Sequence, residues 1–306
     1  MGKYILKRVA ISILTLFVLI TVVFLLVRLM PGDPFSGEKM TPEIRANLEA
    51  YYGMDKPLLE QYFTYVGNLL HGDFGYSMKY TNRTVNEIIA SSFPYSIDLG
   101  MRALALSISM GLVFGILAAR YRGKKLDFFC IVVAILGTSI PDFIMGALLQ
   151  YIFGIEWGLL PVAQYLGLEY TILPAIALGF YTLAMVSRLM RASMLEVVSQ
   201  DYIKTAKSDG ISNFRVVWKH QIRNAIMPVV TVLGPVVAST LTGTFVIESI
   251  FAIPGMGKFY VESVQKLDYS LVLGMTVFYG GFLILANLIV DILYGIIDPR
   301  IRLAGK

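Results

Sequence analysis

The chain has 306 residues, of which 56% are hydrophobic and 15% charged, and a formal net charge of +5. Soluble domains average roughly 45–50% apolar and about 25% charged residues, so this composition indicates a membrane protein rather than a soluble enzyme. The positive charge does not call for a nucleic acid partner, because its distribution along the chain follows the rule for membrane proteins.

Six apolar runs are long enough to cross a bilayer, which takes about 20 residues of helix. They lie at about 9–30, 97–119, 128–153, 171–190, 225–247 and 271–296. Unpaired backbone groups cannot face hydrocarbon, so runs of this kind predict an all-α membrane protein with six transmembrane helices. The first run is followed by Arg28-Leu29-Met30-Pro31-Gly32, which lacks the cleavage site of a signal peptide, so it is expected to be retained.

Basic residues gather on one side of these predicted spans. With the N-terminus in the cytoplasm, the inner segments contain Lys3, Lys7, Arg8, Arg120, Arg122, Lys124, Lys125, Arg188, Arg191, Lys204, Lys207, Arg215, Lys219, Arg223, Arg300, Arg302 and Lys306. The outer loop 154–170 contains no Lys or Arg and carries Glu156 and Glu169. Cytoplasmic loops are enriched in Lys and Arg, so both termini are predicted to be cytoplasmic.

The first polar segment, residues 31–96, is then extracytoplasmic. Thr41-Pro42-Glu43 predicts a helix start, with Thr41 as the N-cap and Pro42 at the first helical position. Apolar residues recur at helical spacing through 56–70, which predicts a second helix. Such a lobe could contact an external partner or pack as a cap over its own helix bundle, and both interpretations stay open.

The second polar segment, residues 196–228, is longer than a simple connection requires and is predicted to dock a water-soluble partner. A helix over 197–209 would end at Gly210 in a left-handed cap, and a second helix would begin at Ser212. In that second helix an apolar side and a basic row are expected: Phe214, Val217, Trp218 and Ile222 on the first, and Arg215, Lys219 and Arg223 on the second. The alternative is a helix held at the surface only by lipid.

Within the spans, small residues and prolines carry the structural information. Ser107, Gly111, Gly115 and Ala119 recur every four residues in the second span, a spacing that lets helix backbones approach closely in lipid. Pro141 predicts a kink in the third span. Asp142 beside it is costly at membrane depth; it either marks a translocation path, locks two helices by hydrogen bonds, or lies near an interface.

The motifs of several enzyme classes are missing. The sequence contains no HExxH zinc pair, no GxxxxGK[ST] phosphate loop and no Gly-x-Ser-x-Gly nucleophile elbow. The chain is therefore not expected to be an enzyme, to have catalytic residues, to bind a metal, or to hold a cofactor of its own. If it transports a solute with ATP, the ATP and Mg are bound by partner subunits.

Several short motifs together resemble the permeases of binding-protein-dependent ABC importers, in particular the B-type subunit of oligopeptide and dipeptide permeases. The signature loop reads Thr205-Ala206-Lys207-Ser208-Asp209-Gly210, closed by Ile226-Met227-Pro228. Further matches are Leu29-Met30-Pro31-Gly32-Asp33-Pro34, Tyr52-Gly53-Met54-Asp55-Lys56-Pro57, His71-Gly72-Asp73-Phe74-Gly75-Tyr76-Ser77, Val246-Ile247-Glu248, Pro254-Gly255-Met256-Gly257 and Asp298-Pro299-Arg300-Ile301. The stretches Phe35-Ser36-Gly37-Glu38, Lys79-Tyr80 and Val85-Asn86 are more similar to the oligopeptide branch.

The resemblance implies the type I ABC importer permease fold in the cytoplasmic membrane of a bacterium or archaeon. It implies a first transmembrane helix within 1–30, the extracytoplasmic segment 31–96, a permease core over 97–296 and a cytoplasmic tail over 297–306. The cytoplasmic coupling loop, 191–224, would use Asp201, Tyr202, Thr205, Ala206 and Gly210 to dock the ATPases.

The implied partners are a second, similar permease subunit, two cytoplasmic ATPase subunits, an extracytoplasmic peptide-binding protein, an oligopeptide substrate and the lipid bilayer. Three positions depart from the family pattern. Lys204 or Thr205 replaces the acidic first position of the signature, and Asp209 stands where relatives often have a basic residue. Asp142 stands where relatives usually have a small polar residue, so the resemblance implies no family-wide role for it. Dipeptide, nickel, glutathione or sugar cargo remains an alternative, as does a stand-alone secondary carrier driven by an ion gradient.

Overall fold

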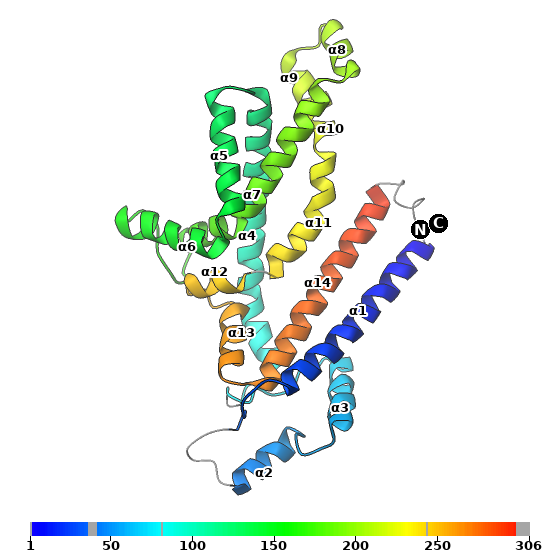
Figure 1. Cartoon of the computed structure of the whole chain (residues 1–306), viewed down its shortest axis with the longest axis vertical. Helices are drawn as coiled ribbons and strands as arrows, with labels where there is room; N and C mark the ends of the chain where they lie inside the picture. Colours follow the sequence, from blue (N-terminus) through cyan, green and yellow to red (C-terminus); the bar gives the residue numbers. More distant parts are fainter. Residues whose placement is uncertain (1, 36–41, 81, 243, 298–306) are drawn as a thin grey trace. The chain divides into compact units, whose positions relative to one another are not determined.

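The structure, a computed structural model, describes residues 2–35, 42–80, 82–242 and 244–297. Within these ranges all regular elements are helices, apart from one isolated bridge between Tyr76 and Thr84, so the predicted all-α class is confirmed there. Four helices are long and apolar enough to cross a membrane, and the number rises to six if each of two bent helix pairs counts as one span (Figure 1). The count of six spans therefore stays a prediction.

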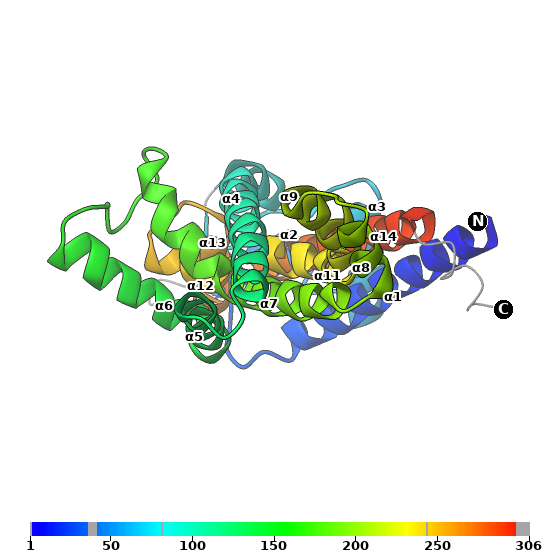
Figure 2. The same ribbon diagram turned by 90° about the horizontal axis from the view of Figure 1, so that it is seen from above.

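The described residues form two compact units, the first comprising the chain up to Pro94 together with Gly255–Gly295. Its helices are α1 (Gly2–Arg28), α2 (Pro42–Tyr51), α3 (Leu58–Leu70), the start of α4 (Val85–Arg120), α13 (Met256–Gln265) and α14 (Tyr269–Ile297). Helices α1 and α14 run side by side (Figure 2). Their shared core is built from Val23, Phe24, Val27, Tyr269, Val272, Leu273 and Val277. An ion pair of 2.8 Å between Arg8 and Asp291 joins the other ends of the two helices.

The segment between α1 and α4 is folded onto this core. Helix α2 begins at Pro42 as expected, and the predicted N-cap Thr41 lies outside the described residues. Helix α3 begins at Leu58, two residues after the start of the predicted 56–70 helix. The fully buried Asp268 caps α14 by accepting from the Leu271 N–H at 3.1 Å. It also accepts from the Ser77 hydroxyl and from the Met78 and Lys79 N–H groups. These contacts support the interpretation of the 31–96 segment as a cap over its own helices.

The second unit, Tyr95–Pro254, contains the rest of α4 and the helices that follow it. They are α5 (Lys125–Ser139), α6 (Asp142–Leu149), the π-helix η1 (Gln150–Glu156), α7 (Glu169–Val198), α8 (Asp201–Ser208), α9 (Asn213–Arg215), the π-helix η2 (Val216–Ile222), α10 (Arg223–Ala225), α11 (Met227–Thr242) and α12 (Phe245–Ile250). The apolar run at 225–247 is thus divided between α11 and α12 rather than forming one helix.

Glycines set the distance between α7 and its neighbours. A Cβ on Gly115 of α4 would lie 2.6 Å from the Met190 Cβ and 2.7 Å from the Ser187 carbonyl oxygen, closer than such atoms can approach. A Cβ on Gly137 of α5 would meet the Ala184 Cβ at 2.7 Å. The predicted small-residue stripe of the second span is therefore confirmed as a packing surface, and α7 is its partner.

The third predicted span is broken rather than continuous. Helix α5 ends at Ser139, Pro141 follows, and α6 with η1 leaves at an angle of 115° to α5. Proline cannot donate the next helical hydrogen bond, and the residue before it avoids the helical region, which accounts for the break at the predicted kink. The fifteen residues of α5 cover about 22 Å, less than the bilayer core of about 30 Å. Asp142 therefore lies at a helix break and not in the middle of a continuous helix.

Substitution of Gly115 by Leu is expected to lower the free energy of unfolding by at least about 2 kcal/mol, because the added side chain must displace the α7 backbone. Thermal unfolding of the purified protein in detergent measures this. Gly67→Leu is the matched control, since a Cβ there meets nothing within 4 Å. Equal melting temperatures for the two variants would contradict the packing account.

Candidate functional site

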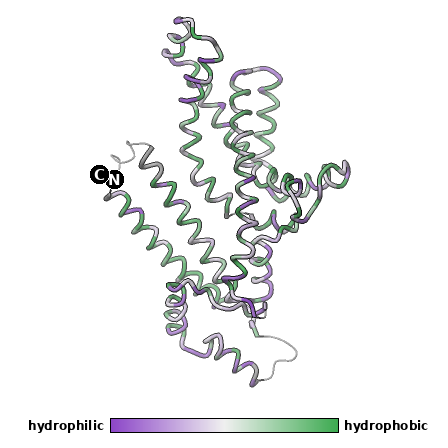
Figure 3. The backbone as a smooth tube through the Cα atoms, turned by 180° about the vertical axis from the view of Figure 1, so that it is seen from behind, coloured by the Kyte–Doolittle hydropathy of each residue, from purple (hydrophilic) through white to green (hydrophobic). Residues whose placement is uncertain are grey.

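The polar end of α7 leads directly into the loop that was predicted to dock a partner. Helix α7 continues to Val198, and α8 follows after Ser199 and Gln200. The predicted helix over 197–209 is therefore wrong at its start, because Val197 and Val198 belong to α7. In Figure 3 this end of the unit is one of the hydrophilic regions of the backbone, in contrast to the apolar helices below it.

Helix α8 has one buried and one exposed side. Ile203 and Ala206 are 0% and 6% exposed and pack with Val216 and Ile211. The exposed side contains three of the predicted site residues, Asp201, Tyr202 and Thr205. Ala206, the fourth, therefore holds α8 in place rather than meeting a partner.

Polar contacts tie the exposed side of α8 to the rest of the loop. The Asn224 amide donates to the Tyr202 hydroxyl at 3.2 Å, which joins α8 to α10. Lys204 and Asp201 form an ion pair of 2.8 Å, but both side chains are largely exposed, so the pair adds little stability. The tyrosine ring stays 43% exposed beside these charges. The surface offers an aromatic ring and hydrogen-bonding groups at an accessible helix face.

Gly210 ends α8 as predicted. Its φ of +73° lies in the left-handed region, and the Ile211 N–H donates to the Ala206 carbonyl at 3.3 Å. This bond, from the residue after the left-handed glycine back to the last turn of α8, is the outer hydrogen bond of a Schellman cap. The packing of Ile211 against Ala206 and Ile203 completes the cap and orients the chain toward the next helix.

The second loop helix is not the regular helix that the sequence pattern predicted. After the three residues of α9, residues Val216–Ile222 form a π-helix, whose wider turn shifts side chains to different faces. Val216 and Gln221 are buried, whereas Phe214 and Trp218 of the predicted apolar side are 70% and 59% exposed. Their rings lie 6.0 Å apart and form an exposed aromatic pair near α8.

The helix break at Asp142 borders an open cavity of about 390 Å³ at the surface of the second unit. Its lining comes from the end of α5 and start of α6, from α7 and from α11: Thr138, Ser139, Ile140, Pro141, Asp142, Leu178, Tyr181, Thr182, Val236, Ser239 and Thr240. Sequence analysis singled out two of them, Pro141 as a kink and Asp142 as a candidate for the translocation path. The hydroxyl residues were overlooked because each is common in apolar helices, although their recurrence in three separate runs was a usable signal.

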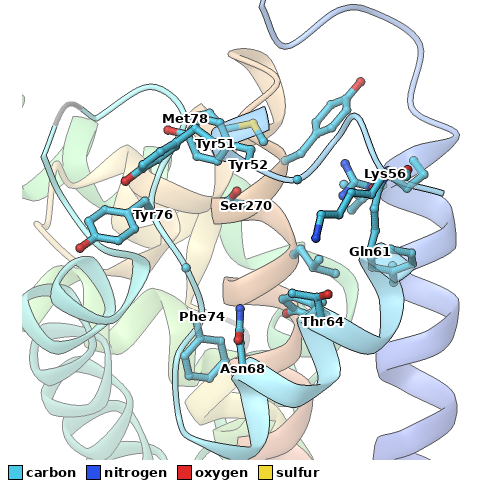
Figure 4. Close-up of a pocket in the computed structure, with 18 of the residues that line it drawn as sticks. Tyr51, Tyr52, Lys56, Gln61, Thr64, Asn68, Phe74, Tyr76, Met78 and Ser270 are labelled. Atoms are coloured by element: carbon cyan, nitrogen blue, oxygen red, sulfur yellow. Dashed lines mark hydrogen bonds between the residues drawn. The ribbon is translucent and has the colours of Figure 1, made fainter. Parts of the chain in front are cut away.

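A second cavity, of about 460 Å³, lies within the first unit. Tyr51, Tyr52 and Tyr76 line one side, and the polar face of α3, with Gln61 and Asn68, lines the other (Figure 4). Burial raises the pKa of the Tyr52 hydroxyl, which keeps it a neutral donor to the Ser77 carbonyl at 3.0 Å. The segment between α1 and α4 is thus a folded lobe that encloses a cavity together with α1 and α14. The sequence did not reveal this cavity.

A family model described as "Binding-protein-dependent transport system inner membrane component" matches residues 111–303, and the N-terminal model of the same transport systems matches residues 1–100. The chain belongs to this family. It is therefore a multi-pass membrane protein of the permease type, and the resemblance identified from the motifs is confirmed.

Several curated relatives match over their whole length. The dipeptide transport system permease protein DppB of Bacillus subtilis is 46% identical, covering 100% of both chains. The oligopeptide transport system permease protein OppB of Haemophilus influenzae is 46% identical, and OppB of Escherichia coli 42%; each covers 99% of this chain and 100% of that protein. Each of these relatives is named as the permease protein of a peptide transport system.

Proposed function

We propose that this chain is the transmembrane permease subunit of an ATP-driven importer that carries oligopeptides across the cytoplasmic membrane. The observation that carries the proposal is full-length identity of 42–46% to peptide permeases. Identity does not separate dipeptide from oligopeptide relatives, since both reach 46%. The oligopeptide assignment rests on Lys79-Tyr80 and Val85-Asn86, and on Phe35-Ser36-Gly37-Glu38, of which residues 36–38 lie outside the described residues.

In this proposal the chain has the type I importer permease fold, with six spans, both termini in the cytoplasm and the 31–96 lobe outside. Each bent helix pair then counts as one span, as its length and hydropathy allow. The tail that starts with Asp298-Pro299-Arg300-Ile301 lies outside the described residues. The bias of Lys and Arg toward one side of the membrane supports this orientation.

The energy comes from partner subunits. The chain has no phosphate-binding loop, so two cytoplasmic ATPases would bind the ATP and Mg, and a second permease would complete the translocation path. An extracytoplasmic binding protein would deliver the peptide to the outer lobe. No residue of this chain is assigned to catalysis or to a metal.

Helix α8 is the proposed docking element for an ATPase. It presents Asp201, Tyr202 and Thr205 on its exposed side, while Ile203 and Ala206 fix its other side to Val216. Because only two residues separate α8 from α7, a shift of α8 would be passed to a long helix within the membrane. The exposed pair Phe214 and Trp218 would extend the same contact surface.

The assignment is tested by isolating the chain from its own membranes and assaying ATP hydrolysis with and without oligopeptide and binding protein. Recovery of a second permease and of ATPases is expected, with hydrolysis stimulated by peptide only when the binding protein is present. A chain that is recovered alone from membranes that express it well would overturn the importer and favour an ion-driven carrier.

Replacement of Gly210 tests the docking helix. Alanine in the left-handed region costs about 1–2 kcal/mol, and proline, with φ fixed near −65°, cannot adopt the observed +73° at all. Peptide uptake is therefore expected to fall in Gly210→Ala and to be abolished in Gly210→Pro, with normal insertion into the membrane. Ala206→Glu, which buries a charge beneath α8, should also abolish uptake.

The matched control is Gly123→Ala, because Gly123 has a φ of +76°, open space around it and a place in the other predicted cytoplasmic loop. Peptide uptake by Gly123→Ala should stay close to that of the unaltered protein. The ATPase subunits should copurify with Gly123→Ala and be lost from Gly210→Pro. Normal uptake in Gly210→Pro at normal expression would contradict the docking role of α8.

A further inference from the structure

The cavity at the α5–α6 break has the chemistry of a cation site. Of the described residues that line it, Asp142 is the only charged one, and none is Lys, Arg or His. Among the described residues, Asp142 forms no ion pair. Its carboxylate accepts a hydrogen bond of 2.8 Å from the Phe143 N–H, a backbone group in the first turn of α6. No cationic side chain neutralises the rest of this carboxylate's charge, so the half-exposed Asp142 can still act as the counter-ion of a bound cation.

The neutral part of the lining favours a hydrogen-bond donor as the ligand. Six hydroxyl side chains face this space: Thr138, Ser139, Tyr181, Thr182, Ser239 and Thr240. The Thr138 hydroxyl, for example, donates to the Ala134 carbonyl at 3.1 Å. A hydroxyl whose hydrogen is already used can offer the cavity only its oxygen lone pairs, which accept.

The size of the cavity fits an organic group rather than a bare ion. Its volume of about 390 Å³ falls in the range of roughly 300–1,000 Å³ found for small-molecule sites. Among the described residues no group of three or more His, Cys, Asp or Glu side chains is placed to hold a metal ion. One carboxylate, several acceptor oxygens and this volume suit an ammonium group on a larger body, since –NH₃⁺ has three donors and no acceptor.

We infer that this cavity binds the N-terminal ammonium group of a peptide in transit, with the Asp142 carboxylate as its counter-ion. The inference rests on the proposed peptide import and adds a specific contact to it. An unmodified peptide carries this ammonium whatever its side chains are. A site that reads the terminus therefore recognises the substrate class without selecting a sequence.

The test compares initial uptake rates of radiolabelled tetra-alanine and N-acetyl-tetra-alanine by the complete importer. Asp142→Asn keeps the size of the side chain and removes its charge. It should lower uptake of the free peptide about tenfold, the loss expected for one charge-assisted hydrogen bond, and leave uptake of the acetylated peptide unchanged. Asp142→Glu keeps the negative charge, so it should take up the free peptide at most of the unaltered rate.

Glu156→Gln is the matched control. Glu156 ends the same α6–η1 segment, accepts from the Tyr151 hydroxyl at 2.7 Å and does not line the cavity, so its loss should change neither rate. An equal effect of Asp142→Asn on both peptides, or no effect on either, would overturn the inference. Failure of the unaltered importer to take up either peptide would instead refute the proposed function itself.

A second measurement applies if the binding protein does not deliver the acetylated peptide. Asp142→Cys is treated with a negatively charged or a neutral methanethiosulfonate reagent; the native Cys130 is buried and 2% exposed. Uptake of tetra-alanine should recover with the negative reagent only. Equal recovery with the neutral reagent would overturn the role of the charge.

Discussion

The close approach of helix backbones to α7 is the constraint on which the second unit depends. Within lipid there is little hydrophobic force between helices, so packing relies on small residues that let backbones meet. Gly111 and Gly115 of α4 and Gly137 of α5 leave no room for a Cβ against α7. The ion pair of Arg191 with the buried Asp127, at 2.8 Å, fastens α5 to the same helix. Helix α7 is thus held along much of its length and continues almost without interruption into α8.

This arrangement joins the two proposed working parts of the chain. At one end, α8 presents an exposed face whose position is set by its buried side and by the cap at Gly210. Further along, α7 supplies Tyr181 and Thr182 to the cavity at Asp142. A well-packed helix responds to force as a unit, so displacement of α8 by an ATPase would alter the cavity lining. The geometry therefore offers a physical route from ATP hydrolysis to the release of a bound ammonium group.

Much of this could be predicted from the sequence, because apolar runs, small-residue spacing and left-handed glycines act locally. The start of α2 at Pro42, the packing stripe at Gly111 and Gly115, and the cap at Gly210 belong to this group. Features set by tertiary contact were missed. The π-helix η2 changed which residues are buried, and α7 extended past the predicted loop boundary. The hydroxyl-lined cavity exists only where α5, α6, α7 and α11 meet.

The central claim, that α8 docks an ATPase on the cytoplasmic side, is tested most directly by cross-linking from a single introduced cysteine. Cys130 is the only native cysteine and is buried, so it should not react with the cross-linker. Any cross-link formed by Tyr202→Cys can therefore be assigned to residue 202. Leu166→Cys, 73% exposed in the predicted outer loop, is the comparison. A cross-link to the ATPase subunit is expected from residue 202 and not from residue 166. A cross-link from residue 166 with none from residue 202 would contradict both the docking site and the orientation of the chain.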